Sequence, residues 1–364
     1  MKATTKLNNI QVLRAFAAIV VVVFHTGYLF PGLRPFGSFG VDVFFVISGY
    51  IMARILDPQS DSNSDHFFRR RVLRIVPPYW FFTILLYLVA LRLPQLMGST
   101  RPRLAELVKS LLFIPFVKGS GLLEPLLFIG WSLNYEMFFY FALAVGIVLS
   151  ARFSATRRPI LATPVVPGAL LVLLTVVLAR FFSAPGSVAS FYARDVILEF
   201  LLGIGVYYAA RAVSDPLARR LRLPALAVCI ATGLLLIAVQ AILPPVEISR
   251  VLTLGIPSFF LVLSASILSQ AGWDTNLKLL VLIGDASYIL YLIHPYCEYS
   301  IDRILGPRLH WLRTATPTGA LISVTASIAV ALLIHLYGER PTVKFLNKNF
   351  GGKRKSVEFS SPRG

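Results

Sequence analysis

The chain has 364 residues, of which 56% are hydrophobic and only 14% are charged, and its mean hydropathy is +0.73. This composition argues against a water-soluble globular protein, and the scattered glycines and prolines argue against collagen-like or disordered chains. The net charge of +18 does not indicate nucleic-acid binding, because the basic residues cluster in short segments between apolar runs. We therefore expect a polytopic membrane protein with no nucleic-acid partner.

The chain contains two cysteines, Cys229 and Cys297, and both lie in or beside apolar runs. This placement argues against a disulfide framework or a metal site built from cysteines. We therefore predict no metal.

Ten apolar segments reach the length of about 20 residues that a helix needs to cross a bilayer. A shorter segment, 104–117, is apolar mostly on one side and contains Glu106 and Lys109, which favours an interfacial or re-entrant helix. The sequence therefore predicts an all-α protein with about ten transmembrane helices. The predicted spans are 10–30, 36–56, 75–93, 126–150, 161–182, 195–213, 224–243, 251–271, 279–298 and 316–338.

The connections that would lie on the same side of the membrane as the N-terminus contain more than twice as many Lys and Arg residues as the connections on the opposite side. Positively charged connections stay in the cytoplasm, so we expect both termini to be cytoplasmic. Residues 1–343 should form one membrane domain, and residues 344–364 a basic, lipid-facing tail.

Ionisable residues at membrane depth indicate function, because each is costly there unless it faces a wet cavity or a partner. Arg14 and His25 lie 11 residues apart in the first span, which places them on one helix face and about 16 Å apart along its axis, at roughly 1.5 Å per residue. Asp42 in the second span lies at the depth of His25, and Glu136 lies near the middle of the fourth span beside Ser132. The sequence therefore predicts that His25, Asp42 and Glu136 perform general acid/base catalysis.

Each of these residues also has a structural interpretation. Arg14 would then extend to the membrane surface, and His25 would bond a neighbouring carbonyl. Asp42 would satisfy backbone groups, and Glu136 would bond a hydroxyl.

Before the third span, Arg71 and Arg74 lie three residues apart and would project together from a helix start. Two guanidinium groups in this arrangement form a phosphate clamp. A basic run in this place is otherwise typical of a topology signal or of a contact with lipid headgroups.

Motifs from residue 10 to residue 341 resemble, in the same order, those of the membrane-bound acyltransferase-3 family, most closely its bacterial members that acylate exopolysaccharide. Only the length differs from some members, which add a periplasmic hydrolase-like domain. The motifs are Ile10-Gln11-Val12-Leu13-Arg14-Ala15 with His25, the run Gly40 to Gly49, Arg71-x-x-Arg74, Trp131-Ser-Leu-x-x-Glu136, Tyr288-x-x-Tyr291-x-x-His294 and Glu339-Arg340-Pro341.

The resemblance implies transfer of an acyl group, typically acetyl from cytoplasmic acetyl-CoA, to a sugar hydroxyl of a lipid-linked or growing polysaccharide. His25 would act as the general base, with Asp42 or Glu136 orienting its ring, or alternatively would form a covalent acyl-His intermediate. The CoA phosphates would bind Arg14, Arg71 and Arg74. The residues expected to bind substrate are Trp131, Ser132, Tyr288, Tyr291 and His294.

The resemblance also implies a multi-pass protein of the bacterial inner membrane, with membrane lipid and proteins of polysaccharide biosynthesis or export as its expected partners. The alternative function is a polysaccharide flippase or a proton-coupled transporter, which would also need buried carboxylates and histidines. A structural partner in a polysaccharide export complex is a third interpretation. The absence of internal duplication and the order of the motifs favour the enzyme.

Overall fold

The computed structural model describes residues 7–28, 30, 32–57, 64–93, 103–118, 121–153, 163–184, 186–242 and 249–350. Within these ranges the chain consists of helices and their connections, with one isolated β-bridge between Val117 and Leu123. The predicted all-α class is therefore confirmed.

Most of the helices are α-helices, and several are preceded or followed by short 3₁₀ or π segments. The α-helices are α1 (Asn8–His25), α2 (Gly40–Leu56), α3 (Ser64–Arg92), α4 (Leu104–Leu111), α5 (Trp131–Phe153), α6 (Val165–Phe182), α7 (Val188–Tyr192), α8 (Glu199–Ala212), α9 (Asp215–Ala241), α10 (Ile256–Gln270), α11 (Lys278–Ser300), α12 (Pro317–Ile334) and α13 (Arg340–Phe350). The 3₁₀ segments are η2 (Phe128–Gly130), η4 (Asp195–Leu198) and η7 (His310–Leu312), and the π segments are η5 (Val251–Gly255), η6 (Ile301–Leu305) and η8 (His335–Glu339).

Eight helices of the described chain are long and apolar enough to cross a membrane, so the protein is a multi-pass membrane protein. The other two predicted spans contain shorter helices, α2 with 17 residues and α8 with 14. Helix α2 begins only at Gly40, because the chain before it forms a turn in which Gly37 has a φ of +115°. The Gln240 side chain accepts a hydrogen bond from the Gly37 N–H at 2.9 Å and so fixes this turn to α9. The segment 104–117 contains only the eight-residue helix α4, which is too short to cross the membrane.

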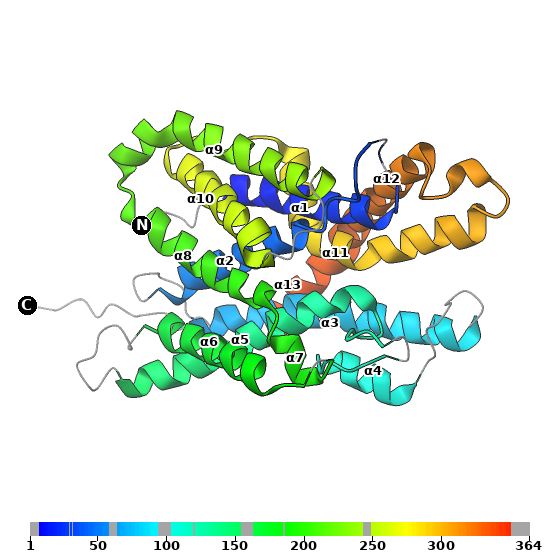
Figure 1. Ribbon diagram of the computed structural model, residues 1–364, viewed down its shortest axis with the longest axis horizontal. Helices are drawn as coiled ribbons and strands as arrows, with labels where there is room; N and C mark the ends of the chain where they lie inside the picture. The colour runs from blue at the N-terminus through cyan, green and yellow to red at the C-terminus, as the bar shows by residue number, and fades with distance from the viewer. Residues whose placement is uncertain are drawn as a thin grey trace, which may run out of the picture.

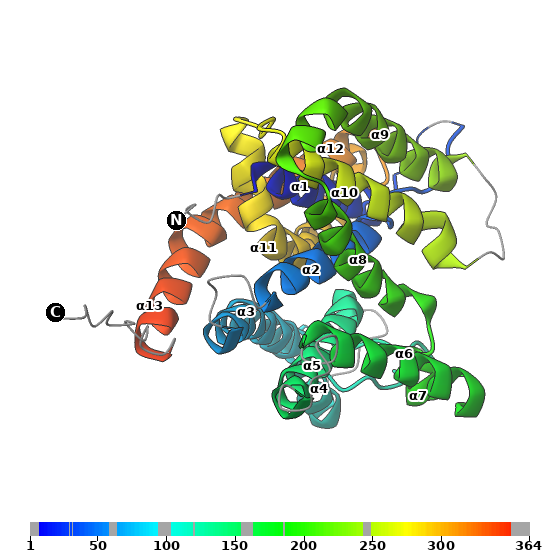
Figure 2. The same ribbon diagram turned by 90° about the vertical axis from the view of Figure 1, so that its left-hand side faces the viewer.

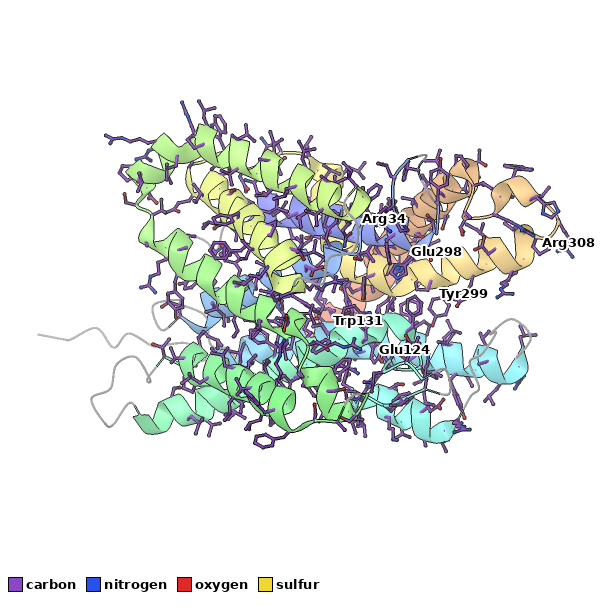
Figure 3. All side chains as sticks on the ribbon, in the orientation of Figure 1. Arg34, Glu124, Trp131, Glu298, Tyr299 and Arg308 are labelled. Atoms are coloured by element: carbon purple, nitrogen blue, oxygen red, sulfur yellow. The ribbon has the colours of Figure 1, made fainter. Side chains whose placement is uncertain are left out.

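The helices form two groups with α2 and α8 between them. One group contains α1 and α9 to α12, and the other contains α3 to α7, as the views in Figures 1 and 2 show. Side chains fill the space between the groups, and Trp131 lies at their boundary (Figure 3). Charged and polar side chains from both groups can therefore meet around α2.

Helix α13 extends from the side of the bundle in Figure 2. It begins at Arg340 and so crosses the boundary that the sequence predicts between residues 343 and 344. The rest of the predicted tail, 351–364, lies outside the described residues.

Glycines bring α2 close to the helices on both of its sides. A Cβ atom at Gly40 would meet the backbone carbonyl of Ala17 in α1, and one at Gly49 would meet the backbone carbonyl of Phe200 in α8. Gly203 of α8 faces Gly49 in the same contact. Close approach without side chains is a common way for helices to pack in membranes, and it holds α2 in the centre of the protein.

The contact between α2 and α8 gives a prediction about stability. We expect Gly49→Ala to lower the thermal unfolding temperature of the detergent-solubilised protein, because the added methyl group forces two backbones apart at a cost of about 1–3 kcal/mol. Gly233→Ala in α9 is the matched control, since a Cβ there meets nothing within 4 Å. Equal unfolding temperatures for the two variants would contradict the close packing.

Candidate active site

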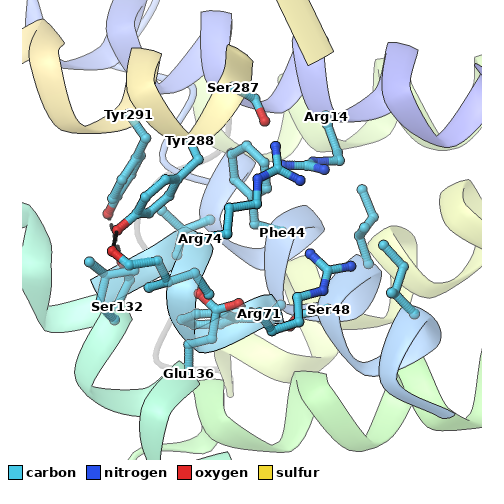
Figure 4. A pocket seen from close by; sticks show the side chains of 16 residues that line it. Arg14, Phe44, Ser48, Arg71, Arg74, Ser132, Glu136, Ser287, Tyr288 and Tyr291 are labelled. Carbon is cyan, nitrogen blue, oxygen red and sulfur yellow. Dashed lines mark hydrogen bonds between the residues drawn. The ribbon is translucent and has the colours of Figure 1, made fainter. Parts of the chain in front are cut away.

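A pocket lies against α2 and is lined by side chains of α1, α2, α3, α5 and α11 (Figure 4). Its free volume is about 90 Å³, whereas ligand pockets usually have about 300–1,000 Å³, so only part of a substrate fits unless side chains move. Seven residues singled out in the sequence line it together: Arg14, Arg71, Arg74, Ser132, Glu136, Tyr288 and Tyr291.

Three arginines make one part of this pocket strongly basic. Arg14 is only 8% exposed, and within the described chain its side chain forms one hydrogen bond, to Gln11 at 3.4 Å, and no ion pair. A guanidinium group that is buried without an ion-pair partner is costly, and an anionic ligand would remove that cost. The arginine cluster is therefore suited to bind phosphate or another anion.

A chain of side-chain hydrogen bonds holds Arg74 in place. Its Nε donates to Glu339 Oε1 at 3.1 Å, and its Nη2 donates to the Asp285 carbonyl at 2.7 Å. Glu339 Oε2 accepts from His335 Nδ1, and His335 Nε2 accepts from Arg340 Nε at 3.0 Å. The sequence identified Glu339 and Arg340 only as a motif and gave His335 no role; the spacing of four residues from His335 to Glu339 was the available signal.

Glu136 faces the arginine cluster, and in Figure 4 it lies next to Arg71. Its carboxylate accepts hydrogen bonds from Tyr140 Oη at 2.5 Å and from Ser48 Oγ at 3.2 Å. Glu136 thus bonds two hydroxyl groups, as its structural interpretation describes, but Ser132 is not one of its partners, because the Ser132 hydroxyl is bonded to Tyr291 Oη at 2.8 Å and to the Ile129 carbonyl at 3.1 Å. The turn η2 supplies this carbonyl and so draws Ser132 toward α11.

His25 lies beside the pocket, on the far side of Tyr291. Its ring centroid is 5.0 Å from that of His294, which in turn is 5.8 Å from the Tyr291 ring. The Nδ1 atom of His25 lies 2.8 Å from the Val21 carbonyl oxygen. Because a carbonyl oxygen only accepts, Nδ1 carries the proton and Nε2 has a free lone pair, as a general base requires.

Asp42 is bound to an arginine instead of to His25. Its two oxygens accept hydrogen bonds from Nε and Nη2 of Arg250, both at 2.7 Å. The predicted contact with His25 is not found, because α2 begins at Gly40 and its first turn directs Asp42 toward the start of η5. The sequence did not indicate Arg250 as the partner of Asp42, because Arg250 lies in the connection before the predicted span 251–271.

The two remaining aromatic residues that were predicted to bind substrate, Tyr288 and Trp131, line different pockets. Tyr288 lines the pocket, and its hydroxyl donates to the Ile75 carbonyl at 2.6 Å. Trp131 contacts Phe45 edge to face, with ring centroids 6.3 Å apart, and lines a different pocket. Only Tyr288 therefore belongs to the site described above.

The sequence profile of an acyltransferase domain, that of the acyltransferase-3 family, matches residues 7–336. The chain belongs to this family. It is therefore an acyltransferase, and all residues that line the pocket lie within the matched region, whereas Glu339, which holds Arg74, lies just after it.

This acyltransferase is similar in sequence to several bacterial proteins. The exopolysaccharide production protein ExoZ of Rhizobium meliloti is 35% identical over 311 residues, which are 85% of this chain and 90% of the relative. Acyltransferase MdmB of Streptomyces mycarofaciens is 25% identical over 385 residues, covering 94% and 93%. The peptidoglycan O-acetyltransferase OatA of Listeria monocytogenes is 26% identical over 217 residues, covering 54% of this chain and 33% of the relative. No solved structure shows a significant match.

The hydrogen-bond chain to Arg74 gives a prediction for this acyltransferase. We expect Glu339→Gln to lower the kcat/KM of acyl transfer roughly tenfold, because an amide has one acceptor oxygen for the two donors that the carboxylate now serves. Glu106→Gln in α4, far from the pocket residues, should leave kcat/KM unchanged. A Glu339→Gln protein with normal kcat/KM would show that Arg74 needs no such support.

Proposed function

We propose that this enzyme transfers an acetyl group from acetyl-CoA to a hydroxyl of an exopolysaccharide or another cell-surface glycan. The names of two relatives, an exopolysaccharide production protein and a peptidoglycan O-acetyltransferase, support O-acylation of a glycan. The observation that carries the proposal is the arrangement on α1, where Arg14 in the basic pocket and His25 with its free Nε2 share one face.

The donor binds at the arginine end of the pocket. The phosphates of CoA accept hydrogen bonds from Arg14, Arg71 and Arg74, and guanidinium groups match phosphate oxygens in pairs. This end faces the basic connections of the chain, which supports placing it in the cytoplasm of a bacterium, where acetyl-CoA is made. The protein then lies in the inner membrane with both termini cytoplasmic.

In this proposal the pantetheine arm of CoA extends from the arginines along α1 and brings the acetyl thioester to His25. Ser132 and Tyr291 line the part of the pocket nearest the two histidines, and their hydroxyls, which are bonded to each other and to the Ile129 carbonyl, would lie beside the thioester or the acceptor. His294 lies against His25 and would contact the acceptor.

His25 acts as the general base. Its Nε2 takes the proton of the acceptor hydroxyl while the hydroxyl oxygen attacks the thioester carbonyl, the C–S bond breaks, and the CoA thiolate receives the proton back from the imidazolium. The Val21 carbonyl keeps Nδ1 protonated and the ring oriented throughout. In this scheme Glu136 orients Arg71, and Asp42 orients Arg250, so neither carboxylate contacts His25.

A histidine substitution tests the role of the base. We expect His25→Ala to reduce transfer from labelled acetyl-CoA to glycan by about 10²–10⁴-fold, while insertion into the membrane stays normal. His310→Ala, which changes an exposed histidine in η7, is the control and should keep full activity. Full activity in correctly inserted His25→Ala protein would remove His25 from the mechanism.

Substitutions in the arginine pair test the donor site. We expect Arg71→Ala and Arg74→Ala to raise the KM for acetyl-CoA by about 10- to 100-fold, because each removes a charge-assisted hydrogen bond of about 1.5–3 kcal/mol, and to change the KM for a neutral glycan little. Arg219→Ala on the exposed surface of α9 serves as the matched arginine control. An unchanged KM for acetyl-CoA in both pocket variants would contradict the donor assignment.

A further inference from the structure

A second pocket lies near the end of the bundle where α1 ends and α2 begins. It is formed by the first residue of α5, the end of α6, the segment from α7 to η4 and the start of η5, and its volume of about 490 Å³ is in the range of ligand sites. Its polar and aromatic lining consists of Trp131, Arg180, Ser183, Ser190, Arg194 and Arg250, together with Asp195.

The second pocket has more positive than negative side chains in its lining, three arginines against Asp195. Arg180 forms an ion pair with Asp195 at 2.9 Å, and Arg250 is bound by Asp42. Arg194 is exposed, lies over the Phe191 ring at 5.7 Å, and forms no ion pair with any described carboxylate. The pocket therefore has one uncompensated guanidinium group that an anion would neutralise.

Arg250 presents a fixed donor to the same space. Two of its nitrogens, Nε and Nη2, are used by Asp42, and within the described chain Nη1 forms no hydrogen bond. The side chain is 38% exposed although the Asp42 that holds it is fully buried. A preorganised guanidinium group loses little conformational entropy when it binds a carboxylate or a phosphate.

The second pocket adjoins the first at α5. Trp131 lines the second pocket, and the next residue, Ser132, lines the first. Phe45, which also lines the first pocket, packs edge to face on the Trp131 ring. A ligand stacked on Trp131 would therefore lie one side chain away from the pocket that contains Ser132 and Tyr291.

We propose that the second pocket binds an acidic glycan as acceptor, with a sugar carboxylate or phosphate on Arg194 and Arg250 and a sugar ring on Trp131. This assignment rests on the proposed function. The two serines and three arginines in the lining suit hydroxyl-rich ligands, whereas besides Trp131 only Ala193 and Val196 are apolar, so the pocket offers little surface for the acyl chains of a lipid. A neutral glycan would leave Arg194 without a counter-charge.

A binding experiment tests the charge preference. The full-length protein in phosphatidylcholine nanodiscs is titrated with trigalacturonate, with a phosphorylated trigalactose, and with neutral trigalactose. We expect at least one acidic probe to bind ten or more times more tightly than neutral trigalactose, and to lose this advantage at high salt. The probe that binds identifies the anionic group as carboxylate or phosphate. Equal binding of all three, or displacement of the probe by added phosphatidylglycerol, would overturn the assignment.

Two arginine variants test whether the preference for acidic glycans arises in the second pocket. We expect Arg194→Gln to abolish the preference for the acidic probe, and Arg308→Gln to preserve it, since Arg308 is an exposed arginine at the same end of the bundle (Figure 3). An Arg194→Gln protein that keeps the preference would overturn the proposal.

Transfer from labelled acetyl-CoA, measured on the same proteins, separates this proposal from the proposed function. Charge-selective binding without any transfer would refute the proposed transfer of acetyl from acetyl-CoA to a glycan and leave the pocket assigned. Transfer that is equally fast to acidic and neutral acceptors would refute the pocket alone.

Discussion

A positive charge inside a bundle of apolar helices needs an anion beside it, and the polar architecture of this protein follows from that requirement. Arg74 has Glu339 and the Asp285 carbonyl, and Arg250 has Asp42. Arg14 is buried more deeply than either of them but has no such partner in the described chain. The carboxylates hold Arg74 and Arg250 in fixed orientations, whereas Arg14 has a buried charge that the proposed anionic donor would neutralise.

Helix α2 connects the two polar regions because it lies between the two groups of helices. Its middle contributes Phe44, Phe45 and Ser48 to the pocket around Arg14, and its first turn contributes Asp42, which holds Arg250 at the second pocket. The glycine contacts to α1 and α8 fix its position. A change in the placement of this one short helix would therefore alter both pockets at once.

The sequence predicted the class of fold and singled out most of the charged and hydroxyl-bearing side chains of the pocket, since span length, motif order and helical spacing are local properties. Arg14, Arg71 and Arg74 line one pocket, as expected for a phosphate site, whereas Glu136, expected beside His25, lies in the arginine pocket instead. What the sequence could not give is rotation about each helix axis. That rotation decides that Asp42 meets Arg250, that Ser132 meets Tyr291, and that Gly49 faces α8 and not α1. The short turn before Gly40 and the π segment at His335 set such rotations, and neither has a strong sequence signal.

Arg14 and His25 stand on one helix whose backbone hydrogen bonds fix their separation at about 16 Å, at roughly 1.5 Å per residue. In the proposed mechanism helix α1 is thus a ruler between the residue that binds the anion and the base, and no loop movement can shorten it. One residue inserted between them would lengthen this ruler by about 1.5 Å and turn one end by about 100° away from the other. A helix of this kind measures the length of the molecule bound along it, so a donor whose charged group and reactive carbon are closer together than the ruler cannot engage both ends.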